Sequence, residues 1–140
     1  MSGQPTDARR FAGTPLARLS VRAGLSALAS VAVNLGLVFA AVARELAPGF
    51  RPLAAPPVVV LTVAAIAGAT GVYGVLRSRS ATPARTFRRV AAIVLLASWV
   101  PDLGLLIVDE TATAAGVAVL MAMHAVVAAA CVALLPGESR

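Results

Sequence analysis

The chain has 140 residues, of which 59% are hydrophobic and only 13% are charged, and its mean hydropathy is +0.89. Soluble domains usually carry about a quarter charged residues, so this composition excludes an ordinary water-soluble protein and indicates a chain surrounded by lipid. All 12 basic residues are arginines, and they lie beside apolar runs. With aromatic residues at only 4%, we expect the net charge of +6 to face anionic lipids at a membrane surface and not nucleic acid.

Four stretches of the chain are nearly free of charged residues, and each reaches the ~20 residues that a helix needs to cross a membrane. Lipid offers the backbone no hydrogen-bond partners, so spans of this length must be helical. Thr14 with Pro15 and Thr82 with Pro83 are typical of helix starts. The sequence therefore predicts an all-α polytopic membrane protein, an antiparallel bundle of four transmembrane helices over about 15–46, 55–77, 83–108 and 111–135.

The uneven distribution of the arginines predicts an orientation. If successive helices alternate in direction, ten arginines fall on one side of the membrane and only Arg44 and Arg51 on the other. Basic residues accumulate on the cytoplasmic side, so we expect a multi-pass protein of the cell (inner, cytoplasmic) membrane with both termini in the cytoplasm. The transmembrane domain would cover 15–136, between a disordered cytoplasmic segment, 1–14, and a tail, 137–140.

Three of these arginines begin the third predicted helix. Arg85, Arg88 and Arg89 follow the spacing i, i+3 and i+4, which places them on one helix face. Arginine stems can lie along apolar surface while the charged ends reach the lipid headgroups. We therefore expect this face to anchor the helix at an interface that contains anionic lipids.

Small residues predict where the helices approach one another. Gly68, Gly71 and Gly74 recur at steps of three in the second span, and the fourth span carries alanines at near-helical spacing. Helices in lipid associate through close packing and interhelical hydrogen bonds. We expect these smooth faces to pack within the chain, while a homo-oligomer or a membrane protein partner remains an alternative.

Two ionisable residues lie inside the spans, Asp102 in the third and His124 in the fourth. A charged side chain at membrane depth costs about 2.5–3.5 kcal/mol on insertion scales, so each needs a partner or a purpose. Asp102 follows Pro101, which cannot donate a backbone hydrogen bond and predicts a kink that frees a carbonyl near Ser98. A structural role in helix pairing and a role in binding or proton transfer both remain open for the two residues.

The predicted turn at 109–110 places Asp102 level with 116–117, about 10 Å from His124 along the helix. A direct hydrogen bond between the two side chains is therefore not expected unless the turn is longer. Asn34 in the first span falls between their levels, with Ser98 near it. The hypothesis is a ligand-binding site or proton relay made of Asp102, His124, Asn34 and Ser98, to which Ser30 and Thr62 also lie close.

Other site chemistry is sparse. The chain has one histidine and one cysteine, Cys131, so neither bis-histidine haem ligation nor an internal disulfide can form. No phosphate-binding loop or zinc-ligand spacing occurs. We assign no catalytic residues, no metal and no cofactor.

The four spans, the pair Pro101–Asp102 and the pair Met123–His124 resemble a family of small bacterial and archaeal membrane proteins known only as a domain of unknown function. The resemblance covers about 17–135 and implies the four-helix fold, without any catalytic residue. The favoured function is a non-enzymatic accessory bundle or one that binds a lipid or small hydrophobic ligand. The alternative is a small transporter or ion pathway that uses Asp102 and His124, and an acid–base enzyme ranks lowest.

Overall fold

The computed structural model describes residues 15–137, so the predicted disordered segment 1–14 and residues 138–140 of the tail lie outside the described residues. The described part is all-α, with four long helices and one short 3-10 helix. Their bounds are α2 Pro15–Ala43, η1 Arg51–Leu53, α3 Ala55–Arg79, α4 Pro83–Val108 and α5 Ala114–Leu134. All four α-helices are long and apolar enough to span a membrane, which indicates a multi-pass membrane protein.

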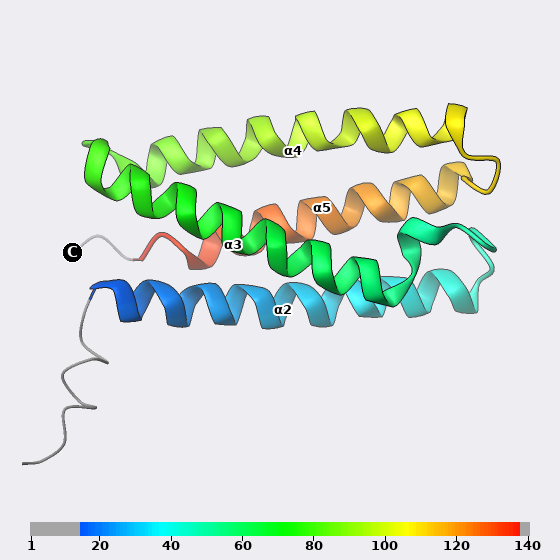
Figure 1. The fold of residues 1–140 in the computed structure, drawn as a ribbon, viewed down its shortest axis with the longest axis horizontal. Helices are drawn as coiled ribbons and strands as arrows, with labels where there is room; N and C mark the ends of the chain where they lie inside the picture. Colours follow the sequence, from blue (N-terminus) through cyan, green and yellow to red (C-terminus); the bar gives the residue numbers. More distant parts are fainter. Residues whose placement is uncertain (1–14, 138–140) are drawn as a thin grey trace, which may run out of the picture.

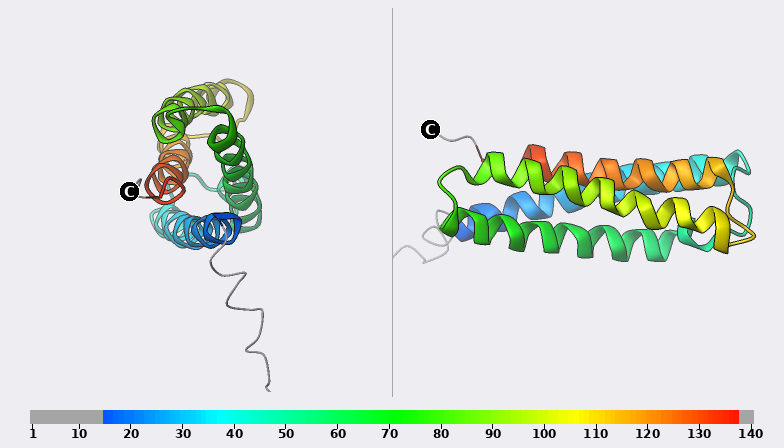
Figure 2. Two further views of the ribbon diagram at one scale, coloured as in Figure 1. Left: turned by 90° about the vertical axis from the view of Figure 1, so that its left-hand side faces the viewer. Right: turned by 90° about the horizontal axis from the view of Figure 1, so that it is seen from above.

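The four helices run antiparallel in chain order around a common interior (Figures 1 and 2). α5 packs extensively against both α2 and α4, and α2 packs as extensively against α3. The seam between α3 and α4 is the least closely packed of the four adjacent pairs. In Figure 1, α3 and α4 lie close at the loop that joins them and diverge toward the opposite end.

Two helix ends differ from the prediction by three residues, and both lie at the end of the bundle that carries few arginines. α2 ends at Ala43, and the chain leaves it through Glu45, which has a positive φ of 50°. α5 begins at Ala114 and not at 111, because Thr113 is its N-cap and accepts a hydrogen bond from the backbone N–H of Gly116 at 2.9 Å. The turn between α4 and α5 therefore comprises five residues, 109–113.

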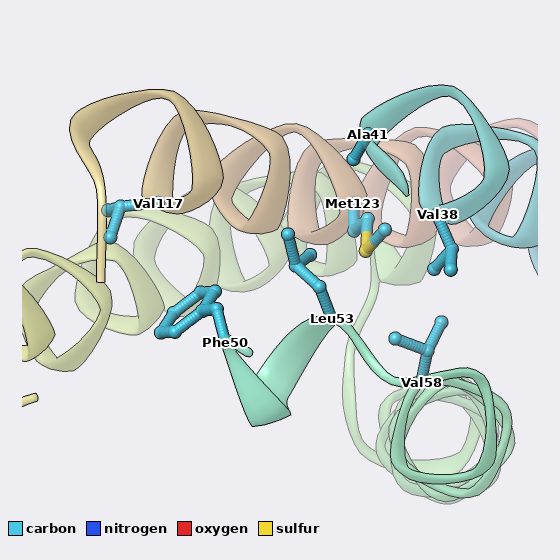
Figure 3. Close-up of a cluster of buried hydrophobic side chains, with 7 residues drawn as sticks. All are labelled: Val38, Ala41, Phe50, Leu53, Val58, Val117 and Met123. Atoms are coloured by element: carbon cyan, nitrogen blue, oxygen red, sulfur yellow. The ribbon is translucent and has the colours of Figure 1, made fainter. Parts of the chain in front are cut away.

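The loop that contains η1 closes this end of the bundle. Phe50 and Leu53 are buried, and they pack among side chains of α2, α3 and α5 (Figure 3). Thr113 fixes the loop further by donating a hydrogen bond from its hydroxyl to the carbonyl of Leu46 at 2.6 Å. We call the apolar cluster at this arginine-poor end the outer cluster. Its buried members are Val38, Ala41, Phe50, Leu53, Val58, Val117 and Met123.

A second apolar cluster fills the opposite, arginine-rich end. Its aromatic members are Tyr73 and Phe87, whose rings meet edge to face with centroids 5.2 Å apart. We call this apolar cluster the basic cluster, after the arginine-rich end at which it lies. It comprises Leu19, Ile66, Tyr73, Phe87, Cys131 and Leu135. Buried polar side chains lie between the two clusters, so the bundle has a polar middle layer and two apolar ends.

The prediction that the glycine face of α3 packs within the chain is wrong for two of its three residues. A Cβ at Gly68 or Gly71 would meet nothing within 4 Å, and one at Gly74 would only touch the Leu19 side chain at 4.0 Å. The close backbone approach occurs elsewhere, at Gly116 of α5, where a Cβ would lie 2.6 Å from that of Ala47. Glycine spacing alone could not distinguish an interior face from an open one.

Candidate functional site

Asp102 and His124 are in direct contact, because the turn between α4 and α5 is longer than the predicted turn at 109–110. The Oδ2 atom of Asp102 lies 3.0 Å from Nδ1 of His124, across the seam between α4 and α5. The carboxylate is almost fully enclosed, with 8% of its side chain exposed, whereas 39% of the histidine side chain is exposed. Asp102 is thus the inner member of the pair, and His124 is the member that an outside molecule can reach.

The contact follows from the length of the turn and from the tilt of the side chains. With five residues between the helices, Asp102 lies level with Leu120 and not with 116–117. That leaves one helical turn, about 6 Å, to His124. Helical side chains lean toward the N-terminus of their own helix, so in this antiparallel pair the two side chains lean toward each other.

The contacts of Nδ1 indicate where one proton of the imidazole lies. Nδ1 of His124 also lies 2.9 Å from the carbonyl oxygen of Leu120, one turn earlier in α5. A carbonyl can only accept, so Nδ1 carries a proton and donates to Leu120. Oδ2 of Asp102 is at ion-pair distance from Nδ1 but has no aligned hydrogen bond, which leaves Nε2 as the ring nitrogen available to a ligand.

Asn34 of α2 forms the second buried polar contact of the middle layer. Its side-chain amide donates to the hydroxyl of Thr62 in α3 at 3.0 Å. Asn34 makes no direct hydrogen bond to Asp102 or His124. Instead, Asn34 and Thr62 join α2 to α3, whereas Asp102 and His124 join α4 to α5.

The buried face of α2 carries two further polar residues, and one of them was missed in the sequence. Ser26 and Ser30 are fully buried, and their hydroxyl oxygens have no hydrogen-bond partner, as is also true of Oδ1 of Asn34. The spacing of Ser26, Ser30 and Asn34 is i, i+4 and i+8, which places them on one helix face. That spacing was the available signal for Ser26.

A cavity of about 380 Å³ connects the predicted site residues. Asn34, Thr62, Ser98 and His124 all line it, one from each of the four helices, and the rest of its wall is largely apolar. Asp102 does not line the cavity and reaches it only through His124. Apolar walls with a few convergent polar groups are typical of small-molecule sites.

The cavity opens sideways, between α3 and α4. Leu61 of α3 and Val94 of α4 line it, yet they are 66% and 60% exposed on the lipid-facing side of the bundle. Its ends reach the two apolar clusters, through Met123 at the outer cluster and through Phe87 at the basic cluster. The exposed part of the cavity wall thus includes residues on the lipid-facing side of the bundle.

The middle of α4 makes two further hydrogen bonds near the cavity. Ser98 donates its hydroxyl proton to the carbonyl of Leu95 at 2.7 Å, and Nε1 of Trp99 donates to the carbonyl of Met121 in α5 at 3.2 Å. The helix continues without a break through Pro101. Trp99 and Asp102 thus hold α4 to α5.

The predicted anchor residues lie at the basic end of the bundle. Arg85, Arg88 and Arg89 are all exposed in the first two turns of α4. Within residues 15–137, no group of three or more His, Cys, Asp or Glu side chains could hold a metal ion. Cys131 is buried in the basic cluster as a free thiol.

The fold and the site define a four-helix, multi-pass membrane bundle with an intramembrane cavity beside a buried carboxylate–imidazole pair. A match to the family of unknown function DUF6069 covers residues 9–140, so the chain belongs to this family. No curated protein and no solved structure shows a significant similarity to the chain.

Proposed function

We propose that this protein is a non-enzymatic membrane bundle that binds a lipid or another small hydrophobic molecule in its cavity. The observation that carries the proposal is the cavity of about 380 Å³, with apolar walls and one polar group from each helix. The volume is within the range of about 300–1,000 Å³ that ligand pockets occupy.

The route of access supports a ligand that arrives through the lipid. Phe50 and Leu53 block the outer end of the bundle, and Tyr73, Phe87 and Leu135 block the basic end. The lateral opening between α3 and α4 lies where the surrounding solvent is hydrocarbon. A molecule dissolved in the membrane can therefore enter without crossing either core cluster.

Native mass spectrometry in mild detergent tests the proposal with a matched pair of variants. Gly68 lines the cavity and Gly71 does not, although both belong to α3 and a Cβ at either position would meet nothing within 4 Å. Gly68→Leu should therefore fold and fill part of the cavity, whereas Gly71→Leu places the same side chain outside it.

We expect a bound small-molecule mass on the wild type and on Gly71→Leu, and its loss from Gly68→Leu. The same bound mass on all three proteins, or on none, would contradict the proposal. A second protein in fixed ratio, or a homo-oligomer without bound ligand, would favour an accessory or assembly role instead.

Orientation and lipid contacts form part of the proposal. Seven described arginines lie at the end of the bundle where α2 and α4 begin, and two lie at the other end: Arg18, Arg22, Arg77, Arg79, Arg85, Arg88 and Arg89 against Arg44 and Arg51. This asymmetry supports a basic end on the cytoplasmic side of the cell membrane, in contact with anionic lipids. Reporter fusions at each terminus would test the orientation.

A proton pathway is the second candidate function. It is favoured by the 3.0 Å contact of Asp102 with His124 and by the unpartnered oxygens of Ser26, Ser30 and Asn34. Buried polar groups without protein partners are commonly satisfied by water, and ordered water carries protons. Proton flux into liposomes that contain the purified protein, abolished by Asp102→Asn, would establish this function, and a flux equal to that of empty liposomes would exclude it.

A further inference from the structure

We infer that the cavity selects molecules whose polar end donates a hydrogen bond, that is, an apolar body with a hydroxyl or an amine at one end. This inference rests on the proposed function and adds the chemistry of the ligand to it. It follows from the hydrogen bonds of Ser98 and His124, which line the α4 and α5 sides of the cavity. Each already directs a proton to a backbone carbonyl.

His124 lines this wall, and 39% of its side chain is exposed. Its Nδ1 proton is directed to the carbonyl of Leu120 at 2.9 Å, and the other neighbour of Nδ1, Oδ2 of Asp102, is an acceptor as well. In the neutral ring Nε2 therefore has a lone pair and no proton. A ligand that meets Nε2 must supply the proton of the hydrogen bond.

Ser98, on the neighbouring helix, likewise offers a hydrogen-bond acceptor to the cavity. Its hydroxyl proton is committed to the carbonyl of Leu95 at 2.7 Å, so only its oxygen lone pairs remain. Ser98 and His124 both line the cavity. A ligand hydroxyl or amine would meet two acceptors on this side, whereas a ligand with only acceptor atoms would meet no donor there.

Asp102 adds a charge preference behind His124. The carboxylate is enclosed, with 8% of its side chain exposed, and its Oδ2 has no aligned hydrogen bond. The imidazole of His124 is its close neighbour, with Nδ1 3.0 Å from Oδ2. An ammonium group at Nε2 would bring a positive charge toward the carboxylate, so the site suits an uncharged hydroxyl or a protonated amine and opposes a second carboxylate.

The chain carries its own reporter for a binding test, because its single tryptophan, Trp99, follows Ser98 in α4. The test uses full-length protein in phosphatidylcholine nanodiscs and three brominated long-chain probes: a primary alcohol, a primary amine and a methyl ether. Bromine quenches tryptophan fluorescence at short range. The ether keeps the apolar body and the oxygen lone pairs, and lacks only the donor.

Quenching that saturates above the level found in Gly68→Leu measures binding in the cavity. We expect the alcohol or the amine to bind at least about tenfold more tightly than the ether, and Ser98→Ala to reduce this preference several-fold. Whichever of the alcohol and the amine binds more tightly shows whether the site prefers a hydroxyl or an amine as the donor. If the amine is tighter, Asp102→Asn should remove its advantage over the alcohol.

Equal affinity for the ether and both donor probes would overturn the inference and leave the proposed function intact. A donor preference that is unchanged in both Ser98→Ala and His124→Leu would also overturn it, since the preference would then arise elsewhere. Quenching by all three probes that equals the Gly68→Leu level would overturn the proposed function together with the inference.

Discussion

The two sides of α4 show opposite kinds of packing. Toward α5, Trp99 and Asp102 make polar contacts with Met121 and His124, and the helices pack extensively. Toward α3, the middle of the seam has no hydrogen bond or ion pair among the described residues, and a cavity opens there. Both seams are rich in apolar side chains, so hydrophobic composition does not account for the difference.

The difference illustrates how helices associate in lipid. Leucine and valine gain little by leaving lipid for another helix, so close packing and polar contacts determine which seams close. α5 has both, because Gly116 lets its first turn approach the outer loop and His124 contacts α4. The seam between α3 and α4 has neither in its middle, and this leaves a space that a ligand can occupy.

The largest expected effect comes from disturbing the close approach of α5. Gly116→Ala would place a methyl group 2.6 Å from Cβ of Ala47 and 3.3 Å from the Phe50 ring, in a region closed by buried side chains. Overpacking of this kind typically costs about 1–3 kcal/mol. Gly71→Ala, on the open face of α3, should be neutral or stabilising.

Reversible unfolding in mixed micelles gives the free energy of unfolding of both variants. Equal values for Gly116→Ala and Gly71→Ala would show that the close approach at Gly116 contributes nothing to closing α5 against the loop.

The second prediction concerns the contact that closes the seam between α4 and α5. A double-mutant cycle with Asp102→Asn and His124→Gln should give a coupling energy of about 0.6 kcal/mol, with about 1.7 kcal/mol as the upper range for such contacts in membranes. The same cycle between Asp102 and Asn34, which are not hydrogen-bonded to each other, is the control. A larger coupling in the control pair would contradict the arrangement described above.

A smaller effect is expected at the other polar contact of this seam. Trp99→Phe keeps an aromatic ring and removes the Nε1 donor to the carbonyl of Met121, so we expect a loss of about 0.5 kcal/mol in unfolding free energy. Val100→Leu, at a lipid-facing position of the same helix, should change nothing. If the two variants are equally stable, the indole hydrogen bond does not help to close the seam.

The smallest effect is a dependence on pH at the turn that joins α4 to α5. The side-chain hydroxyl of Thr111 and then its backbone N–H, both donating to Asp109, lower the pKa of this carboxyl from its ordinary value of 3.8. A lowered pKa means that the ionised form is favoured in the folded turn. The stabilisation is therefore present above about pH 4 and is lost as the pH falls through the lowered pKa.

Hydrogen exchange at the Thr111 amide should accordingly quicken in acid in the wild type, beyond the intrinsic change in rate. Asp109→Asn should not show this pH dependence. Matching pH profiles for the two proteins would show that the Asp109 carboxylate does not hold the turn.

The fold could be predicted from the sequence because its signals are local. Apolar runs of about 20 residues give the four helices, and Pro83 marks a helix start that the structure confirms. The start of α5 was placed three residues too early, because Asp109 and Thr111 bond to each other and Thr113 is the true N-cap. That small error in the turn length placed Asp102 and His124 too far apart along the bundle.

Features that depend on tertiary packing could not be read from the sequence. Gly68 and Gly71 have the same spacing as a packed glycine face, yet no helix covers them. Phe50 and Leu53 lie in a loop, where nothing local indicates that they fold back into the end of the bundle. Asn34, Ser98 and His124 were expected to lie close together, and all three line the same cavity.

The single histidine of the chain allows a direct test of the central claim, that His124 faces a cavity supplied from the lipid. NMR of protein with isotope-labelled histidine, in nanodiscs, reports both the imidazole tautomer and the protons near the ring. The account predicts a proton on Nδ1, an unprotonated Nε2, and nuclear Overhauser effects from ring protons to alkyl-chain protons of lipid or ligand. A ring that shows such effects only to water, or only to protein protons, would contradict it.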